Sequence, residues 1–290
     1  FSSRRRHTRY ISVTGVQTCA LPIFIAALRA PVAILLDAGS FLFSAILLLS
    51  IRTRNADAPA PSELQGHGAA PRGSLRSEIA AGGRYVFRNP ALCTIGAATA
   101  TSNLFSTMAN TLLFLFAIRE LGMSEALIGL AFTLSGIGGL VAAAMADRIS
   151  KRLGVGKTIL LMAPLAGPFT AAVALGQPGA DALNIGLIAA SGFVGAGSGT
   201  IYNINQVSLR QAITPEPMQG RMNATMRWFV WGTIPIGALL GGLLGEWIGV
   251  RETVALGGAL ATLAFVPLLF GPVPSVRTMP TGVDDAQGLA

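Results

Sequence analysis

Polar side chains recur at helical spacing within an apolar segment that covers residues 92–117. Asn103, Thr107 and Asn110 are four and then three residues apart, so on a helix they form one stripe along an otherwise apolar surface. A polar group without a partner in hydrocarbon costs on the order of 1–3 kcal/mol, so such side chains usually face other protein or a water-filled cavity. We predict that this stripe lines a polar pathway, with hydrogen bonds between helices as the alternative.

A second stripe of this kind lies in the apolar segment 183–206. Ser198, Tyr202 and Asn205 have the same spacing, and Gln206 adjoins them. The same physical argument applies, so these side chains are expected to face the pathway or to hydrogen-bond a neighbouring helix.

Asp37 is the one acid placed deep within an apolar segment, which here covers residues 31–51. A carboxylate at that depth is a candidate for proton coupling or for binding a cationic group. A structural hydrogen bond or salt bridge is the other interpretation, and the residue alone does not decide between them.

Three glycines stand four residues apart in the apolar segment 223–248. Gly237, Gly241 and Gly245 fall on one helix face, and Pro235 precedes them by half a turn. Small residues at this spacing let two membrane helices approach closely, and proline bends a helix. We expect this face to be a helix-packing surface.

Catalytic and metal-binding residue sets are missing from the sequence. The two histidines are His7 and His67, and neither lies near a cluster of acids that could form a catalytic or metal site. No glycine-rich phosphate loop with lysine is present. Both lysines, Lys151 and Lys157, lie in a loop, which argues against a retinal receptor with a buried lysine. We therefore predict no enzyme activity, no metal and no cofactor.

The composition indicates which solvent surrounds these segments. Of the 290 residues 52% are hydrophobic and 12% are charged, whereas soluble domains carry about 25% charged residues. The bilayer is therefore the expected partner. The net charge of +8 comes from short clusters between apolar runs, so nucleic acid is not expected to bind.

Seven segments have the length of about 20 residues that a membrane-spanning helix requires. We predict an all-α polytopic membrane protein with seven transmembrane helices. The segments cover residues 31–51, 92–117, 126–146, 158–176, 183–206, 223–248 and 253–271.

Connections that are rich in Lys and Arg alternate along the chain with connections that are poor in them. Fourteen of these basic residues lie in one set of connections and two, Arg119 and Arg251, lie in the other. The positive-inside rule places the rich set in the cytoplasm. The C-terminus is then cytoplasmic, and the first segment begins outside.

The parts outside the spans differ in character. Residues 1–23 resemble translated sequencing-adapter sequence, and we expect them to be non-native and disordered. We assign 24–51 to the first helix and 52–90 to a cytoplasmic linker. The linker begins rich in Pro and Gly and ends in an expected short amphipathic helix or a solvated loop. Residues 273–290 are expected to be a disordered cytoplasmic tail.

The string MADRISKRLGVGK places Asp147, Arg148, Arg152 and Gly154 directly after the segment 126–146. It resembles the cytoplasmic G-x-x-x-D-R-x-x-x-R-x-G loop of the major facilitator superfamily, although Ala143 stands where the first glycine would be. The resemblance implies that Asp147, Arg148 and Arg152 form a conformational latch of a rocking transporter. A plain basic stop at the membrane surface is the alternative.

Three further strings resemble the drug, macrolide and siderophore exporter-like branch of that family: LLDAGSFLFSA, IYNINQVSLRQAITPEPMQGRMNATMR and WGTIPIGALLGG. The resemblance covers about residues 25–280. It implies a parent of twelve helices in which this chain runs from the sixth to the twelfth, with residues 91–272 as a six-helix bundle. The glycines after Pro235 resemble a degenerate copy of the family's antiporter motif.

The function that this resemblance implies is secondary active export of small amphipathic molecules by proton antiport in a bacterial cytoplasmic (inner) membrane. The small-molecule substrate and the missing N-terminal half are then the implied partners, and the fragment alone is expected to be inactive. A non-transporting membrane scaffold and a seven-helix protein of another type remain as alternatives.

Overall fold

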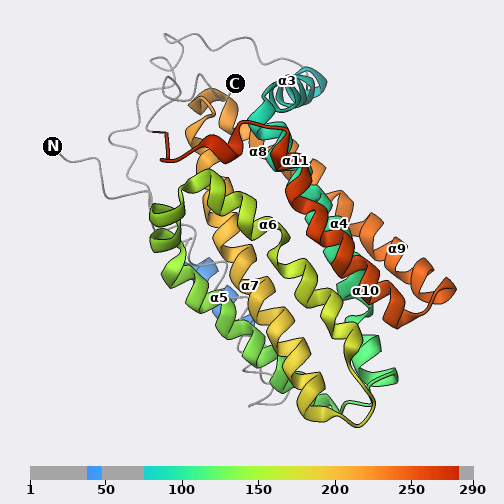
Figure 1. Cartoon of the computed structure of the whole chain (residues 1–290). Coiled ribbons are helices and arrows are strands. Elements are labelled where there is room, and N and C mark those ends of the chain that lie inside the picture. The colour runs from blue at the N-terminus through green and yellow to red at the C-terminus, as the bar shows by residue number, and fades with distance from the viewer. Residues whose placement is uncertain (1–37, 48–74, 281–290) are drawn as a thin grey trace, which may run out of the picture.

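The computed structural model describes residues 38–47 and 75–280 (Figure 1). Asp37, the segment 1–23 and the Pro/Gly-rich part of the linker lie outside the described residues. The short apolar helix Ala38–Leu47 falls within the first predicted segment, whose remaining residues also lie outside the described part.

Six helical spans long and apolar enough to cross a membrane make up the body of the described chain, which contains no β-strand. The predicted all-α polytopic fold is thereby confirmed. Three spans are interrupted: α6 continues into a 3-10 turn, α8 and α9 form one span, and α10 continues through a second 3-10 turn into α11. Their bounds are α4 Pro90–Arg119, α5 Glu125–Leu153, α6 Val155–Ala172 with η1 Val173–Leu175, α7 Asp181–Ala212, α8 Glu216–Trp231 with α9 Thr233–Trp247, and α10 Val250–Ala261 with η2 Thr262–Phe265 and α11 Val266–Leu269.

Local chemistry explains where several of these helices begin and end. Asn89 caps α4 by accepting a hydrogen bond from the amide of Leu92 at 3.0 Å, and Pro90 occupies the first helical position, where its missing N–H costs nothing. Gly154 separates α5 from α6 with a φ of 86°, a conformation that strongly favours glycine.

The six spans form two three-helix units with the same internal arrangement. In one unit α7 packs against α5 and α6, and in the other α4 packs against α9 and α10. The two units meet where α6 packs against α10, which lie side by side in Figure 1. A Cβ added at Gly167 or at Gly258 would collide with backbone atoms of the opposite helix. Glycine at these two positions therefore allows the two helices to approach closely.

The glycines of α9 lie against α4. A Cβ added at Gly241 would stand 2.6 Å from the carbonyl oxygen of Met108, and one added at Gly237 would collide with the carbonyl of Leu104. Gly245 in turn faces the side chain of Leu112. The structure therefore places all three glycines at a close helix–helix contact, the surface for which their spacing was singled out.

An equivalent close contact joins α5 to α7. Ser135, Gly138, Ala142 and Ala146 are buried at intervals of three and four residues along α5. A Cβ at Gly138 would collide with the backbone of Phe193 on α7. The same small-residue spacing is visible in the sequence but was not used to predict this surface.

The span formed by α8 and α9 breaks at Gly232. Pro235 has no N–H for the carbonyl of Trp231, so the regular hydrogen-bond ladder cannot continue there. One residue earlier, the carbonyl of Val230 accepts from the side-chain amide of Asn103 at 3.2 Å and from the hydroxyl of Thr233 at 2.8 Å. The predicted bend of this segment is thus a division into two helices.

Arg251 connects several helices at one end of the bundle, the end where few residues are basic. Its guanidinium lies 3.3 Å from the carboxylate of Glu120 and donates to the carbonyls of Ala174 and Gly176 at 2.6 and 2.8 Å. It also lies over the ring of Phe116. One cation therefore joins the ends of α4, α6 and α10, which explains a basic residue on this side.

The opposite end is closed by two segments outside the spans. The helix α3 (Leu75–Arg88) packs on α8 and lies in the part of the linker for which a short amphipathic helix or a solvated loop was expected. The 3-10 turn η3 (Val273–Ser275) begins a return segment: the amides of Val155 and Gly156 donate to the carbonyls of Arg277 and Val276. Residues 273–280 therefore differ from the expected disordered tail, because they satisfy the free N–H groups at the start of α6.

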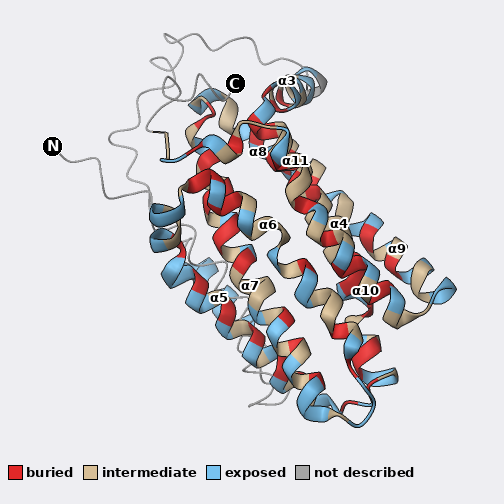
Figure 2. Ribbon diagram, in the orientation of Figure 1, coloured by how far each residue is buried: buried red, intermediate tan, exposed pale blue. Residues whose placement is uncertain are grey.

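Burial follows the faces where the helices meet, and the outward faces are exposed (Figure 2). Many of the exposed side chains are large and apolar, including Leu140, Leu239, Trp247 and Phe270. Exposed apolar surface on this scale marks contact with lipid or with another protein.

Candidate functional site

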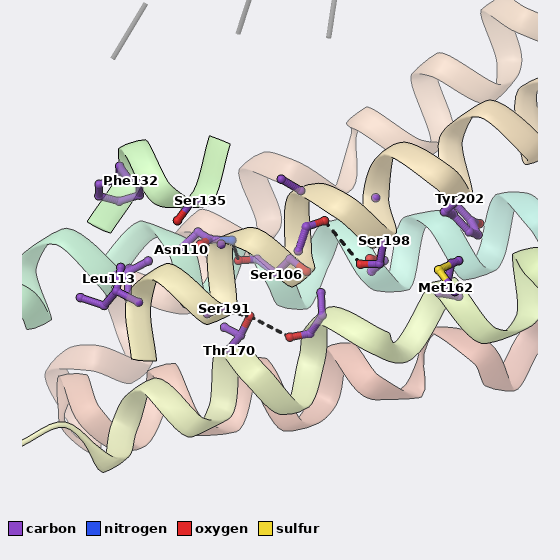
Figure 3. Close-up of a pocket in the computed structure, with 18 residues that line it drawn as sticks. Ser106, Asn110, Leu113, Phe132, Ser135, Met162, Thr170, Ser191, Ser198 and Tyr202 are labelled. Carbon is purple, nitrogen blue, oxygen red and sulfur yellow. Dashed lines mark hydrogen bonds between the residues drawn. The ribbon is translucent and has the colours of Figure 1, made fainter. Parts of the chain in front are cut away.

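A cavity of about 290 Å³ lies among α4, α5, α6 and α7 (Figure 3). It opens between the two three-helix units, where α4 and α7 do not pack closely. Its polar lining residues are Ser102, Ser106, Asn110, Ser135, Thr170, Ser191, Ser198 and Tyr202, and its larger apolar ones are Leu113, Phe132, Met162 and Ile188.

The polar lining consists of hydroxyls and one amide. No Asp, Glu, Lys or Arg from the described ranges lines the cavity. Hydroxyls and amides donate and accept hydrogen bonds without a net charge, and the apolar residues supply area for burial. The lining therefore suits a neutral molecule with both apolar and hydrogen-bonding parts.

Four of these eight polar groups, including Asn110 and Ser135, hydrogen-bond to a carbonyl of their own helix. Asn110 donates its side-chain amide to the carbonyl of Ser106 at 2.8 Å, and Ser135 donates to the carbonyl of Ala131 at 2.8 Å. Hydroxyls whose proton is used in this way keep lone pairs that can accept from a bound molecule.

Tyr202 closes one end of the cavity. Its hydroxyl lies 2.7 Å from the hydroxyl oxygen of Thr99, which itself lies 2.8 Å from the carbonyl of Ile95. Because Thr99 has one proton and directs it to Ile95, the phenol of Tyr202 is the donor to Thr99. The ring is fixed between α7 and α4 by this chain of hydrogen bonds.

The structure brings together three of the seven predicted pathway residues: Asn110, Ser198 and Tyr202 line the cavity. Asn103 and Thr107 do not line it. Asn103 bonds the carbonyl of Val230, and the side chain of Thr107 lies next to Gly237.

The remaining two predicted residues lie further along α7. Asn205 accepts from the hydroxyl of Ser150 at 2.7 Å and donates to the carbonyl of Ile201, which ties α7 to α5. Gln206 donates to Asn203 at 2.7 Å, and its own carbonyl oxygen is buried without a partner among the described residues. Neither residue lines the cavity: Asn205 joins α7 to α5, and Gln206 hydrogen-bonds within α7.

Five polar lining residues were absent from the predicted set. Ser102 and Ser106 precede Asn110 at intervals of four residues, so a polar stripe along this face was visible in the sequence. The predicted stripe began one residue later, which turns it by about 100° around the helix. Ser135 and Thr170 are isolated hydroxyls in apolar segments and carry no periodic signal, whereas Ser191 lies seven residues before Ser198 and extends the predicted stripe on α7.

The predicted latch lies at the exposed end of α5. The carboxylate of Asp147 lies 2.7 Å from the ammonium of Lys151 one turn later, and both side chains are 75% exposed. Arg148 and Arg152 are also exposed. Within the described residues the acid therefore pairs along its own helix.

Metal chemistry finds no support in the described ranges, where no three His, Cys, Asp or Glu side chains come together as a ligand group. Asp37, the candidate acid, lies outside these ranges.

Comparison with known proteins identifies the family to which the chain belongs. A sequence profile of the Major Facilitator Superfamily matches residues 13–211 and 97–287, two overlapping ranges that together take in most of the chain. Neither the curated proteins nor the solved structures gave a match. With six apolar spans and a polar cavity between its two three-helix units, the chain belongs to the Major Facilitator Superfamily and is a multi-pass membrane transporter.

Proposed function

We propose that the protein exports small amphipathic molecules of the drug, macrolide or siderophore type by proton antiport. The observation that carries this proposal is the cavity among α4, α5, α6 and α7, with hydroxyls beside apolar side chains and no charge among the described lining residues. A small amphipathic molecule gains from apolar burial, and a few hydrogen bonds orient it. The likeness of LLDAGSFLFSA and WGTIPIGALLGG to exporter-like facilitators supports the outward direction.

The six-helix bundle works together with a second bundle. Alternating access in such folds comes from one bundle rocking against another around a site between them. The exposed apolar faces of α5 and α9, with Leu140 and Leu239 as examples, supply surface for such a partner. The N-terminal bundle of the parent that the family resemblance implies is the proposed partner, and residues 75–280 without such a bundle are not expected to transport.

Proton coupling requires a group that can gain and lose a proton within the membrane. In the described spans every Asp and Glu lies at or near a helix end, and none lines the cavity. The coupling acid is therefore Asp37 or a carboxylate of the second bundle. If Asp37 instead has a structural role, the second bundle supplies the acid.

The protein lies in the cytoplasmic membrane of a bacterium with its C-terminus in the cytoplasm. This orientation follows from the fourteen basic residues on one side of the spans and the two on the other. Asp147, Arg148 and Arg152 are then at the cytoplasmic end, where they hold the inward-closed state.

Accumulation in cells tests the proposal directly. Cells that produce this chain joined to its second bundle should retain less erythromycin and less chloramphenicol, an uncharged amphipathic drug, than cells without it. Ser106→Leu together with Asn110→Leu, which fills the cavity, should abolish the difference. Gly242→Leu is the matched control, because nothing lies within 4 Å of a Cβ at that position.

Two outcomes would reject the proposal. Unchanged accumulation of both compounds on production of the transporter would reject export of this class and would favour a non-transporting scaffold. Export that persists with Leu at both Ser106 and Asn110 would show that the cavity is not the pathway.

Proton coupling is tested in everted vesicles. Adding either compound should release protons from an acidified vesicle lumen.

A further inference from the structure

The helix α3 is held firmly against α8 at the basic end of the bundle. Gly82 allows this approach, since a Cβ there would lie 2.9 Å from the carbonyl oxygen of Arg221. Glu78 and Arg221 form an ion pair at 3.5 Å, and the hydroxyl of Tyr85 donates to the carbonyl of Ile213 at 3.3 Å. The helix therefore has a fixed place beside the span formed by α8 and α9.

The remaining surface of α3 combines apolar and cationic side chains. Ile79 and Phe87 are 65% and 56% exposed although both are large and apolar, and they fall on one face, eight residues apart. Arg84 and Arg88 are exposed beside them. After Asn89 the chain passes directly into the membrane span α4. An amphipathic helix in this place lies at the level of the lipid headgroups.

A cavity of about 420 Å³ opens beside these arginines. Arg84, Tyr85, Arg88 and Asn89 line it, together with Met218 at the start of α8. Within the described residues neither Arg84 nor Arg88 makes a hydrogen bond or an ion pair, whereas Glu78 is already paired with Arg221. Two guanidinium groups one helical turn apart thus border a cavity with no described protein anion to neutralise them.

We propose that this cavity binds the phosphate headgroup of an anionic phospholipid from the adjoining leaflet. Arg84 and Arg88 hold the phosphate oxygens, because a guanidinium offers paired donors that match a phosphate. Ile79 and Phe87 lie along the acyl chains. The apolar face next to the cations selects a lipid over a free phosphate, which would leave that face in water.

Lipid retention by the purified chain tests this proposal independently of transport. The 290-residue chain in neutral detergent is titrated with phosphatidylglycerol or phosphatidylcholine, and bound lipid is counted by native mass spectrometry. The wild-type chain should retain phosphatidylglycerol selectively. Arg84→Gln with Arg88→Gln should weaken retention about 25-fold, from about fivefold for each charge near the membrane surface.

Matched controls separate this site from general charge. Lys157→Gln with Arg277→Gln removes the same charge from exposed positions at the same end of the bundle and should leave retention unchanged. Arg88→Lys keeps the charge but loses the paired donors, so it should bind the lipid more weakly than wild type and more tightly than Arg88→Gln, and melting curves check that each variant is folded.

Three results would overturn the proposal. If the Arg84/Arg88 double variant retains as much lipid as wild type, the two arginines do not bind the headgroup. An equal loss in the Lys157/Arg277 variant would mean that only net charge matters. Displacement of the lipid by 10 mM inorganic phosphate alone would indicate a small-anion site without a role for the apolar face.

Discussion

The hydroxyl oxygens of Thr170 on α6 and Ser191 on α7 lie 3.2 Å apart at the wall of the cavity (Figure 3). Thr170 already directs its proton to the carbonyl of Ala166 at 3.1 Å. Ser191 is therefore the donor of the shared hydrogen bond. This contact joins α6 to α7 at the wall of the cavity.

A double-mutant cycle should detect this hydrogen bond. Thr170→Val and Ser191→Ala each remove it, so their effects on the free energy of unfolding should overlap by about 0.6 kcal/mol, the usual coupling of polar pairs between membrane helices. Thermal unfolding in detergent provides the measurement. Strictly additive effects of the two substitutions would mean that the hydroxyls do not interact.

The glycine contact between α9 and α4 gives a sharper test, because two neighbouring glycines differ in surroundings. Gly241→Ala forces a Cβ against the carbonyl of Met108 and should cost about 1–3 kcal/mol of unfolding free energy. Gly242→Ala meets nothing within 4 Å and should stabilise the helix by up to about 1 kcal/mol. Equal melting temperatures for the two variants would contradict this packing.

Arg251 is expected to contribute more to stability than its ion pair alone. Arg251→Ala removes the hydrogen bonds to the carbonyls of Ala174 and Gly176 and should cost about 2 kcal/mol. Glu120→Gln removes only a partly exposed ion pair and should cost less than about 1 kcal/mol. Melting curves of both variants in detergent should show this order; the reverse order would assign the stability to the ion pair.

The Asp147–Lys151 pair should contribute little to stability and much to function. Asp147→Asn breaks an exposed pair within one helix, so the unfolding free energy should change by less than about 0.5 kcal/mol. If Asp147 belongs to the latch, export by the transporter with both bundles should nevertheless fall clearly. Lys151→Gln separates the alternatives, since it breaks the same pair but keeps the acid. If export by Asp147→Asn is unimpaired, Asp147 is not part of a latch, and the loop acts only as a basic stop at the membrane surface.

The fold could be predicted because its cause is local and repeated. Each span needs a run of apolar residues of bilayer length, and the six runs within residues 92–271 all appear as helical spans. The helices extend beyond the apolar runs, as α5 does to Leu153, because charged residues continue a helix into the headgroup region. Segment length therefore marks the membrane-embedded part and not the helix ends.

The cavity could be predicted only in part, because a helix in lipid is apolar on most faces. In α4 the polar residues at 102, 103, 106, 107 and 110 cover two adjoining faces, and the sequence does not say which faces α7. Packing decides this. Gly237 on α9 packs against the face of α4 that carries Thr107, and the face that carries Ser106 lines the cavity. The return of residues 273–280 to α6 likewise depends on backbone hydrogen bonds that no composition signals.

Water and substrate must reach the cavity between α4 and α7 if this cavity is the transport pathway, and single cysteines test this most directly. With Cys19 and Cys93 replaced, Ser106→Cys and Ser191→Cys should react with a water-soluble thiol reagent in membranes that contain the transporter. Leu239→Cys, on an exposed apolar face of α9, should react at least tenfold more slowly. Erythromycin should slow the reaction at both cavity positions. Reaction at Ser106→Cys as slow as at Leu239→Cys, or no protection by erythromycin, would contradict the assignment.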